Sequence, residues 1–163
     1  MKAAFQPIID NNCIILILGT MPGEESLCKQ EYYAHKTNQF WRIIFAIFNT
    51  PVISNYETKK HLLLRNKIAL WDVLAYCKRE GSADSAIQCE IPNNFDKLYT
   101  EYPNLKYICF ASKKAEEYYK KYIGKSESKE YYTLSSPSSA YASKSFDKKV
   151  EDWSIINKLL NYR

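Results

Sequence analysis

Several features that would place the chain in a membrane or an export class are missing from this sequence. No apolar run approaches the ~20 residues that a membrane-spanning helix needs. Segment 1–12 lacks the charged start, apolar centre and small-residue cleavage site of a signal peptide. We therefore expect a cytoplasmic protein with no membrane partner. Its 163 residues suit a single domain, 1–163, with one core.

Metal-binding cysteine motifs are also absent. The five cysteines are scattered along the chain and form no C-x-x-C pair: Cys13, Cys28, Cys77, Cys89 and Cys109. This pattern disfavours zinc and iron–sulfur ligation, and it favours free, mostly buried thiols in a reducing compartment. We expect no metal and no cofactor.

The charge balance is only mildly basic, whereas the aromatic content is high. The net charge is +5, and 15% of the residues are aromatic, with 14 tyrosines among them. Basic and aromatic side chains together suit nucleic acid, because lysines neutralise phosphates and aromatic rings stack on bases. Composition alone favours the plainer interpretation, in which the tyrosines are half-buried and the lysines keep the protein in solution.

Apolar runs and helical spacing alternate along the chain. Apolar runs predict strands at 13–18, 68–74, 105–110 and 130–134. Helical spacing predicts helices at 38–48, 56–66, 94–101, 113–123 and 145–162, with Ser112 capping the fourth. Loops are expected at 19–37 and 78–92. This alternation predicts an α/β fold, a three-layer sandwich with a four-stranded parallel sheet flanked by helices.

Two loops are expected to meet at the carboxyl edge of this sheet, where open α/β sheets bind ligands. The first is the turn 19–23, whose glycines let the backbone approach a ligand and whose N–H groups suit a developing anion. The second, 135–140, combines four serines with a proline and precedes Lys144, which suits contacts with a phosphate backbone. Turns without any function use the same residue types.

Three polar residues, Tyr33, His35 and Asn38, lie between these loops in the sequence. An asparagine at a helix start is most simply an N-cap, whose side chain accepts a hydrogen bond from a backbone N–H. His35 is equally explained as a structural histidine. The residues alone leave both capping and catalysis open at Asn38.

The motifs in this region resemble those of the uracil-DNA glycosylase superfamily. The turn Gly-Thr-Met-Pro-Gly at 19–23 is similar to the G-x-N-P-G loop of the mismatch-specific uracil/thymine glycosylases. Segments 33–35 and 38–41 resemble their F-A-H-P and N-R-F-W motifs at the same spacing. The most similar branch is that of the hypoxanthine-DNA glycosylases, with G-S-M-P-G and R-N-x-F-W. Further similarities at 70–74, 81–87 and 136–138 extend the resemblance over most of the chain.

The resemblance implies a monofunctional DNA glycosylase of base excision repair, acting as a monomer on double-stranded DNA. Such an enzyme flips a deaminated base, here hypoxanthine or else uracil or xanthine, out of the duplex and hydrolyses its N-glycosidic bond. The asparagine that matches Asn38 is catalytic in this branch. We expect the base to be bound by Gly19, Thr20, Met21, Pro22, Gly23, Tyr33 and His35. We expect DNA contacts from Ser135, Ser136, Pro137, Ser138, Ser139 and Lys144.

Two departures from the family patterns keep alternatives open. Met21 stands where the mismatch-specific enzymes have a catalytic asparagine, and Ser136 stands where uracil-DNA glycosylases have a catalytic histidine. The alternatives are a G:U/T mismatch-specific uracil-DNA glycosylase and a non-catalytic nucleotide- or DNA-binding α/β module. Asp72 and Asp84 are second-tier site candidates, since each carboxylate is equally suited to holding a loop through backbone N–H groups.

Overall fold

A four-stranded, all-parallel sheet forms the centre of the molecule. The computed structural model describes residues 1–161, and Tyr162, the predicted end of the last helix, lies outside them. The strand order is β3-β2-β6-β7. The strands are β2 (Ile15–Gly19), β3 (Ile68–Asp72), β6 (Tyr107–Phe110) and β7 (Glu130–Thr133). The predicted α/β fold with four parallel strands is confirmed.

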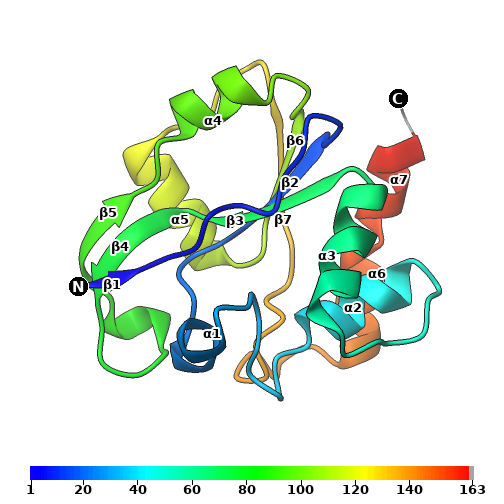
Figure 1. Ribbon diagram of the computed structural model, residues 1–163, viewed down its shortest axis with the longest axis horizontal. Coiled ribbons are helices and arrows are strands. Elements are labelled where there is room, and N and C mark those ends of the chain that lie inside the picture. Colours follow the sequence, from blue (N-terminus) through cyan, green and yellow to red (C-terminus); the bar gives the residue numbers. More distant parts are fainter. Residues whose placement is uncertain (162–163) are drawn as a thin grey trace.

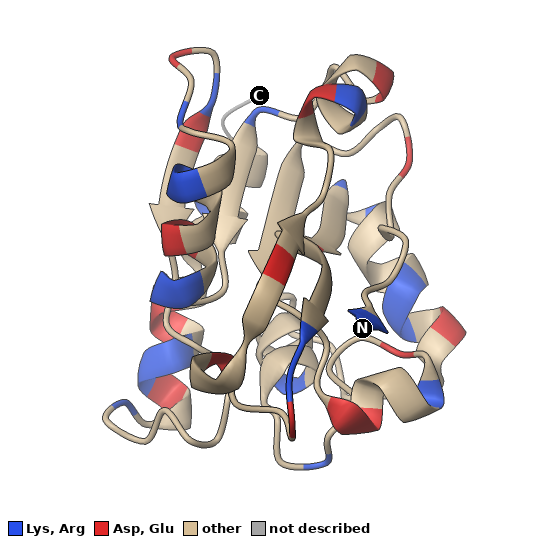
Figure 2. Ribbon diagram, turned by 90° about the vertical axis from the view of Figure 1, so that its left-hand side faces the viewer, with Lys and Arg blue, Asp and Glu red and all other residues tan. Residues whose placement is uncertain are grey.

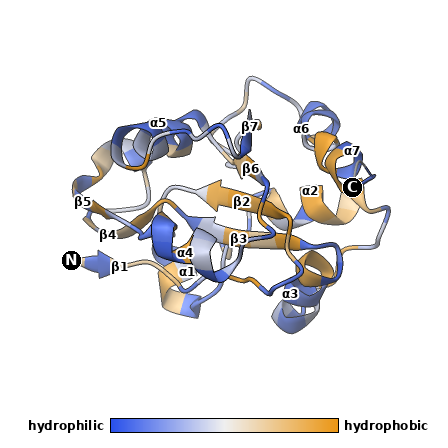
Figure 3. Ribbon diagram, turned by 90° about the horizontal axis from the view of Figure 1, so that it is seen from above, coloured by the Kyte–Doolittle hydropathy of each residue, from blue (hydrophilic) through white to orange (hydrophobic). Residues whose placement is uncertain are grey.

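Helices cover both faces of this sheet (Figure 1). One face is covered by α2 (Phe40–Ile47), α3 (Tyr56–Arg65), α6 (Phe146–Trp153) and α7 (Ile155–Asn161). The other face is covered by α4 (Phe95–Glu101) and α5 (Lys113–Tyr122). The view from above shows the sheet between these two helical layers (Figure 3). The three-layer sandwich is therefore also confirmed.

The apolar run of β2 is continuous because both of its faces are buried. Ile15 and Ile17 pack into the core on the α2 side, whereas Leu16 and Leu18 pack into the core on the α5 side. Side chains alternate between the faces of a strand, so two cores require an apolar residue at every position. Ser112 caps α5 as predicted, since its Oγ accepts the N–H of Ala115 at 3.1 Å.

A second, antiparallel sheet was not predicted. It has the order β1-β4-β5 and consists of β1 (Lys2–Ala3), β4 (Leu74–Lys78) and β5 (Gln88–Pro92). The prediction of a loop over 78–92 is therefore wrong, and β3 ends at Asp72 rather than at residue 74. The chain leaves the parallel sheet where Val73 donates its N–H to Gly19 O at 2.9 Å. Short, half-exposed strands such as β4 and β5 carry little apolar signal.

Two helix predictions also need correction. The expected loop 19–37 contains α1 (Glu24–Lys29), a six-residue helix too short to show apolar periodicity. The expected closing helix 145–162 is divided into α6 and α7 at Ser154. Ser154 Oγ donates to Val150 O, four residues earlier, at 2.7 Å. A bond of this kind often bends a helix, and the division between α6 and α7 lies at this residue.

Most charged side chains lie on the outer surfaces, whereas Asp72, Arg79 and Lys149 are buried. Lysine and glutamate alternate along the outer side of α5 (Figure 2), where Lys114 and Lys120 pair with glutamates of the helix and Lys125, which follows it, pairs with Glu116. Among residues 1–161, no helix is long and apolar enough to cross a membrane. Cys13, Cys77 and Cys109 are buried, whereas Cys28 and Cys89 are exposed, and all five thiols are free.

Candidate active site

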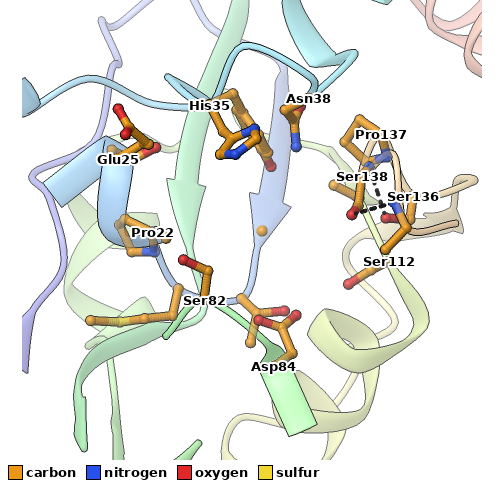
Figure 4. A pocket seen from close by; sticks show the side chains of 18 of the residues that line it. Pro22, Glu25, His35, Asn38, Ser82, Asp84, Ser112, Ser136, Pro137 and Ser138 are labelled. Atoms are coloured by element: carbon orange, nitrogen blue, oxygen red, sulfur yellow. Dashed lines mark hydrogen bonds between the residues drawn. The ribbon is translucent and has the colours of Figure 1, made fainter. Parts of the chain in front are cut away.

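A pocket of about 610 Å³ opens at the carboxyl edge of the parallel sheet. Its wall is formed by Asp72 and by segments 19–26, 82–84, 111–112 and 136–141, together with Tyr32, Tyr33, His35, Thr37 and Asn38. The two loops expected to meet do so: Thr37 Oγ1 lies 3.0 Å from Ser139 Oγ, and Gln39 N donates to Pro137 O at 2.8 Å. Figure 4 shows the labelled side chains arranged around this pocket.

The turn 19–23 is held from behind by the connection between β4 and β5. Arg79, which is buried, donates from Nη2 to Pro22 O. Glu24 N donates to Ser82 Oγ at 2.9 Å. The predicted loop segment 81–87 therefore forms part of the pocket wall and fixes the turn from the second sheet.

The turn supplies backbone groups rather than reactive side chains. Met21 is 7% exposed and packs into the core on the α5 side. Within residues 1–161, the N–H groups of Thr20, Met21 and Gly23 make no hydrogen bond. Unpaired N–H groups at a buried turn are available to an acceptor on a ligand.

Asn38 supports the start of α2 and also lines the pocket. Its Oδ1 accepts the N–H of Phe40, the first residue of α2, at 2.9 Å, although the N-cap position itself belongs to Gln39. The side chain points into the pocket (Figure 4). A backbone N–H requires an acceptor, so the amide oxygen faces Phe40 and the Nδ2 donor remains for a ligand.

Tyr33 lines the pocket from the segment that precedes α2. One face of its ring stacks on Phe40, with ring centroids 4.1 Å apart and 14° between the ring planes. Its backbone φ of 54° lies in the left-handed region, which non-glycine residues rarely adopt and which is frequent at functional sites. Burial raises the pKa of the Tyr33 phenol well above its ordinary value, so the hydroxyl stays protonated.

His35 lies at the exposed rim of the pocket. Its Nδ1 accepts the N–H of Thr37 at 3.2 Å and lies 2.9 Å from Thr37 Oγ1. Because a backbone N–H only donates, neutral His35 carries its proton on Nε2. His35, Thr37 and Ser139 thus form a chain of contacts that joins the two loops.

The serine loop is ordered mainly by its own hydroxyls. Ser136 Oγ accepts Ser138 N, and Ser138 Oγ accepts Ala140 N, each at 3.2 Å. Pro137 and Ser139 line the pocket with them. The structure does not bring Ser135 or Lys144 to the pocket. Both bond to Asp152 instead, Ser135 Oγ at 2.7 Å and Lys144 Nζ at 2.5 Å.

Lys149 is a supporting residue that the sequence interpretation missed. It is 1% exposed, and its Nζ donates to Gln39 Oε1 at 2.8 Å and to Ser138 O at 3.1 Å. Burial lowers the pKa of its ammonium group. Lys149 therefore ties the serine loop to the residue beside Asn38. A lysine on the apolar face of a helix was the available signal for this role.

Two carboxylates, Asp72 and Asp84, line the same pocket. Burial raises the pKa of Asp72 to about 7, and the neighbouring Asp84 adds to this shift, whereas Arg79 opposes it. Burial also raises the pKa of Asp84, whose Oδ1 lies 3.6 Å from Arg79 Nη1. Asp84 pairs with the same Arg79 that donates to Pro22 O, whereas Asp72 Oδ2 has no hydrogen-bond partner among residues 1–161.

A groove adjoins the pocket and shares Tyr32, Tyr33, His35 and Asn38 with it. Its volume is about 260 Å³, and four cations line it: Lys29, Lys36, Arg42 and Lys59. Glu31 is the acidic residue among its lining side chains. The sequence interpretation missed this basic cluster because the four residues are dispersed over the chain.

Comparisons with known proteins identify the family of this chain. Residues 7–160 match the model of the uracil DNA glycosylase superfamily. A hypoxanthine DNA glycosylase of Methanosarcina barkeri is 46% identical over 118 residues, which cover 72% of this chain and 75% of that protein. A hypoxanthine DNA glycosylase of Methanosarcina acetivorans is 40% identical over 158 residues, 96% of this chain and 98% of that protein.

A solved structure supports the same assignment. The solution NMR structure of a Methanosarcina acetivorans protein, described as a candidate uracil DNA glycosylase, is 36% identical and matches with a TM-score of 0.83. The match covers 99% of both chains. The predicted resemblance is thus confirmed by sequence and by fold, and the chain belongs to the uracil DNA glycosylase superfamily.

Proposed function

We propose that this DNA glycosylase releases hypoxanthine from deoxyinosine in double-stranded DNA, with Asn38 as a catalytic residue. The two curated relatives are hypoxanthine DNA glycosylases, and they match most of the chain at 46% and 40% identity. The observation that carries the proposal is the orientation of Asn38, whose oxygen is held by Phe40 N while the side chain points into the pocket.

The Asn38 amide acts in this proposal as a hydrogen-bond donor. Its Oδ1 is engaged by the first N–H of α2, so Nδ2 is the group that meets the flipped base. Together with the N–H groups of Thr20, Met21 and Gly23, it stabilises negative charge that develops on the departing base. Loss of one such preorganised donor typically costs about 3 kcal/mol, or at least a hundredfold in rate.

Further substrate contacts are proposed for Tyr33, for the serine loop and for the cations of the adjoining groove. The ring of Tyr33, supported from behind by Phe40, stacks on the flipped base, a contact worth about 1–3 kcal/mol. Contacts of Ser136, Pro137, Ser138 and Ser139 with the DNA backbone remain a proposal, supported by their position on the opposite wall.

Two substitutions at Asn38 separate catalysis from capping. Asn38→Asp keeps an acceptor for Phe40 N and removes the Nδ2 donor, whereas Asn38→Ala removes both. We expect both variants to release hypoxanthine from an inosine duplex about a hundredfold or more slowly under single-turnover conditions. Only Asn38→Ala should also lose about 1 kcal/mol of folding stability.

The control measurement is DNA binding, which both variants should retain. Base release by Asn38→Asp at the parental rate would show that Asn38 only caps the helix. A loss of DNA affinity equal to the loss of rate would also contradict the proposal, because the donor is assigned to the chemical step.

A further inference from the structure

The Asp72 carboxyl group has an unusual position for a structural aspartate. It is the last residue of β3, lines the pocket and is 4% exposed. Its Oδ2 has no hydrogen-bond partner among residues 1–161. The backbone of Asp72 does take part in the fold, since its carbonyl accepts Asn93 Nδ2 at 2.8 Å. The side chain therefore remains a buried polar group that the fold does not use.

The adjoining strand is shaped to accommodate this carboxyl group. Asp72 pairs in register with Gly19, and a Cβ atom on Gly19 would lie 2.6 Å from Asp72 Oδ1 and 2.8 Å from Tyr33 Oη. The carboxyl and phenol groups thus occupy the space over Gly19, and both residues line the pocket that Asn38 enters.

Charged and titratable groups approach Asp72 from three elements. Asp84 comes from the short 3-10 helix Asp84–Ala86, Arg79 follows β4, and Tyr32 and Tyr33 precede α2. Burial and the like charge of Asp84 outweigh the attraction of Arg79, and they raise the pKa of Asp72 to about 7. A carboxyl group that retains its proton near neutral pH is suited to act as a general acid.

We propose that Asp72 is a second catalytic residue, which donates a proton to a ring nitrogen of the flipped purine as its glycosidic bond breaks. This inference rests on the proposed release of hypoxanthine. It assigns Asp72 a chemical role distinct from that of Asn38, which donates a hydrogen bond but not a proton.

The proton balance of the step is closed. The Asp72 proton moves to a ring nitrogen of hypoxanthine, and the C1′–N9 bond breaks with its electron pair passing to the base. Hypoxanthine then leaves as a neutral molecule, and a water oxygen bonds to C1′ of the oxocarbenium ion. The proton lost by that water restores the neutral Asp72 carboxyl group, so no other reactant is needed.

The pH dependence of base release tests this role. Two variants are compared with the parental protein: Asp72→Asn, and Asp84→Asn as its matched variant. Single-turnover release of hypoxanthine from an inosine duplex is measured between pH 5 and pH 9 for the parental protein and for both variants. The parental rate should fall above about pH 7, as Asp72 ionises. Asp72→Asn should be about a hundredfold slower at pH 6 and should lose this inflection.

Asp84→Asn should retain an inflection but shift it to lower pH, because it removes a like charge beside Asp72. A parental rate independent of pH, an unchanged inflection in Asp72→Asn, or no shift in Asp84→Asn would each overturn the role of Asp72. If Asp72→Asn does not fold, the shift in Asp84→Asn decides. Absence of any hypoxanthine release by the parental protein would instead overturn the proposed function.

Discussion

Gly19 shows how one residue without a side chain makes room for two polar groups. A methyl group there would lie 2.6 Å from Asp72 Oδ1 and 2.8 Å from Tyr33 Oη, closer than real Cβ contacts. We therefore expect Gly19→Ala to displace both groups, to cost about 1–3 kcal/mol of stability and to slow base release at least tenfold. Single-turnover rates and thermal unfolding measure these effects.

Gly23→Ala is the matched control for this substitution. Its Cβ would meet only the exposed Ser82 side chain, at 3.1 Å and 3.3 Å, so the effect should be smaller. Equal rates for Gly19→Ala and the parental protein would contradict the importance of the space over Gly19.

Asp72 also links folding stability to pH. Its pKa is raised from 3.8 to about 7 in the folded state, so between these values the folded protein binds more protons than the unfolded chain. Stability therefore falls as pH rises from about 4 to 7. Asp72→Asn should raise the free energy of unfolding at pH 8, by up to about 4 kcal/mol, and change it much less at pH 4.5. Urea unfolding at the two pH values checks this, and an equal effect at both would contradict it.

At the scale of elements, α6 supports the site through a single buried lysine. Lys149 satisfies two acceptors, Gln39 Oε1 and Ser138 O, which belong to the two sides of the pocket. Lys149→Met keeps the apolar stem and leaves both acceptors without this donor. We expect a loss of about 2 kcal/mol in unfolding free energy and a slower base release. Lys148→Met, at an exposed neighbouring position, is the control and should change neither quantity measurably.

The elements that could be predicted from sequence are those with strong periodicity. The four parallel strands and α2 to α5 were placed correctly because their apolar residues are buried in two cores. The β4–β5 hairpin escaped prediction because its residues are largely exposed, as in Tyr76 and Ile91 at 46% each. That hairpin carries Arg79 behind the turn, so a part of the site was missed with it.

The site residues also divide into those that a local sequence pattern predicts and those that only tertiary packing brings together. Asn38, Tyr33 and the glycine turn lie in one continuous stretch of sequence, and their motifs could be recognised. Lys149 and the basic groove depend on tertiary packing, which brings together residues that no local pattern relates. Contacts of Ser135 and Lys144 with DNA stay predictions, because both residues bond to Asp152.

At the scale of the whole molecule, the small net charge of +5 conceals a local concentration of cations beside the pocket. Replacing Lys36 and Arg42 with glutamine should weaken duplex binding and reduce the slope of log affinity against log salt by up to about two. The rate of base release at saturating protein should change little. Fluorescence anisotropy at several salt concentrations measures the slope.

Lys97 and Lys106 provide the matched control for this double substitution. Both are exposed, at 72% and 58% of their side-chain surface, and neither lines the pocket or the groove. Their replacement with glutamine should affect DNA affinity less. Equal salt slopes for the two double variants would show that the groove does not contact DNA.

The most direct measurement is the identification of the base that the purified protein releases. Duplexes containing inosine, uracil opposite guanine, or xanthine are incubated with the protein, and the free base and the alkali-labile abasic strand are quantified. The expected result is free hypoxanthine with an equal amount of abasic product, faster than from the other duplexes. Faster release of uracil, or no product from any duplex, would contradict the proposed function.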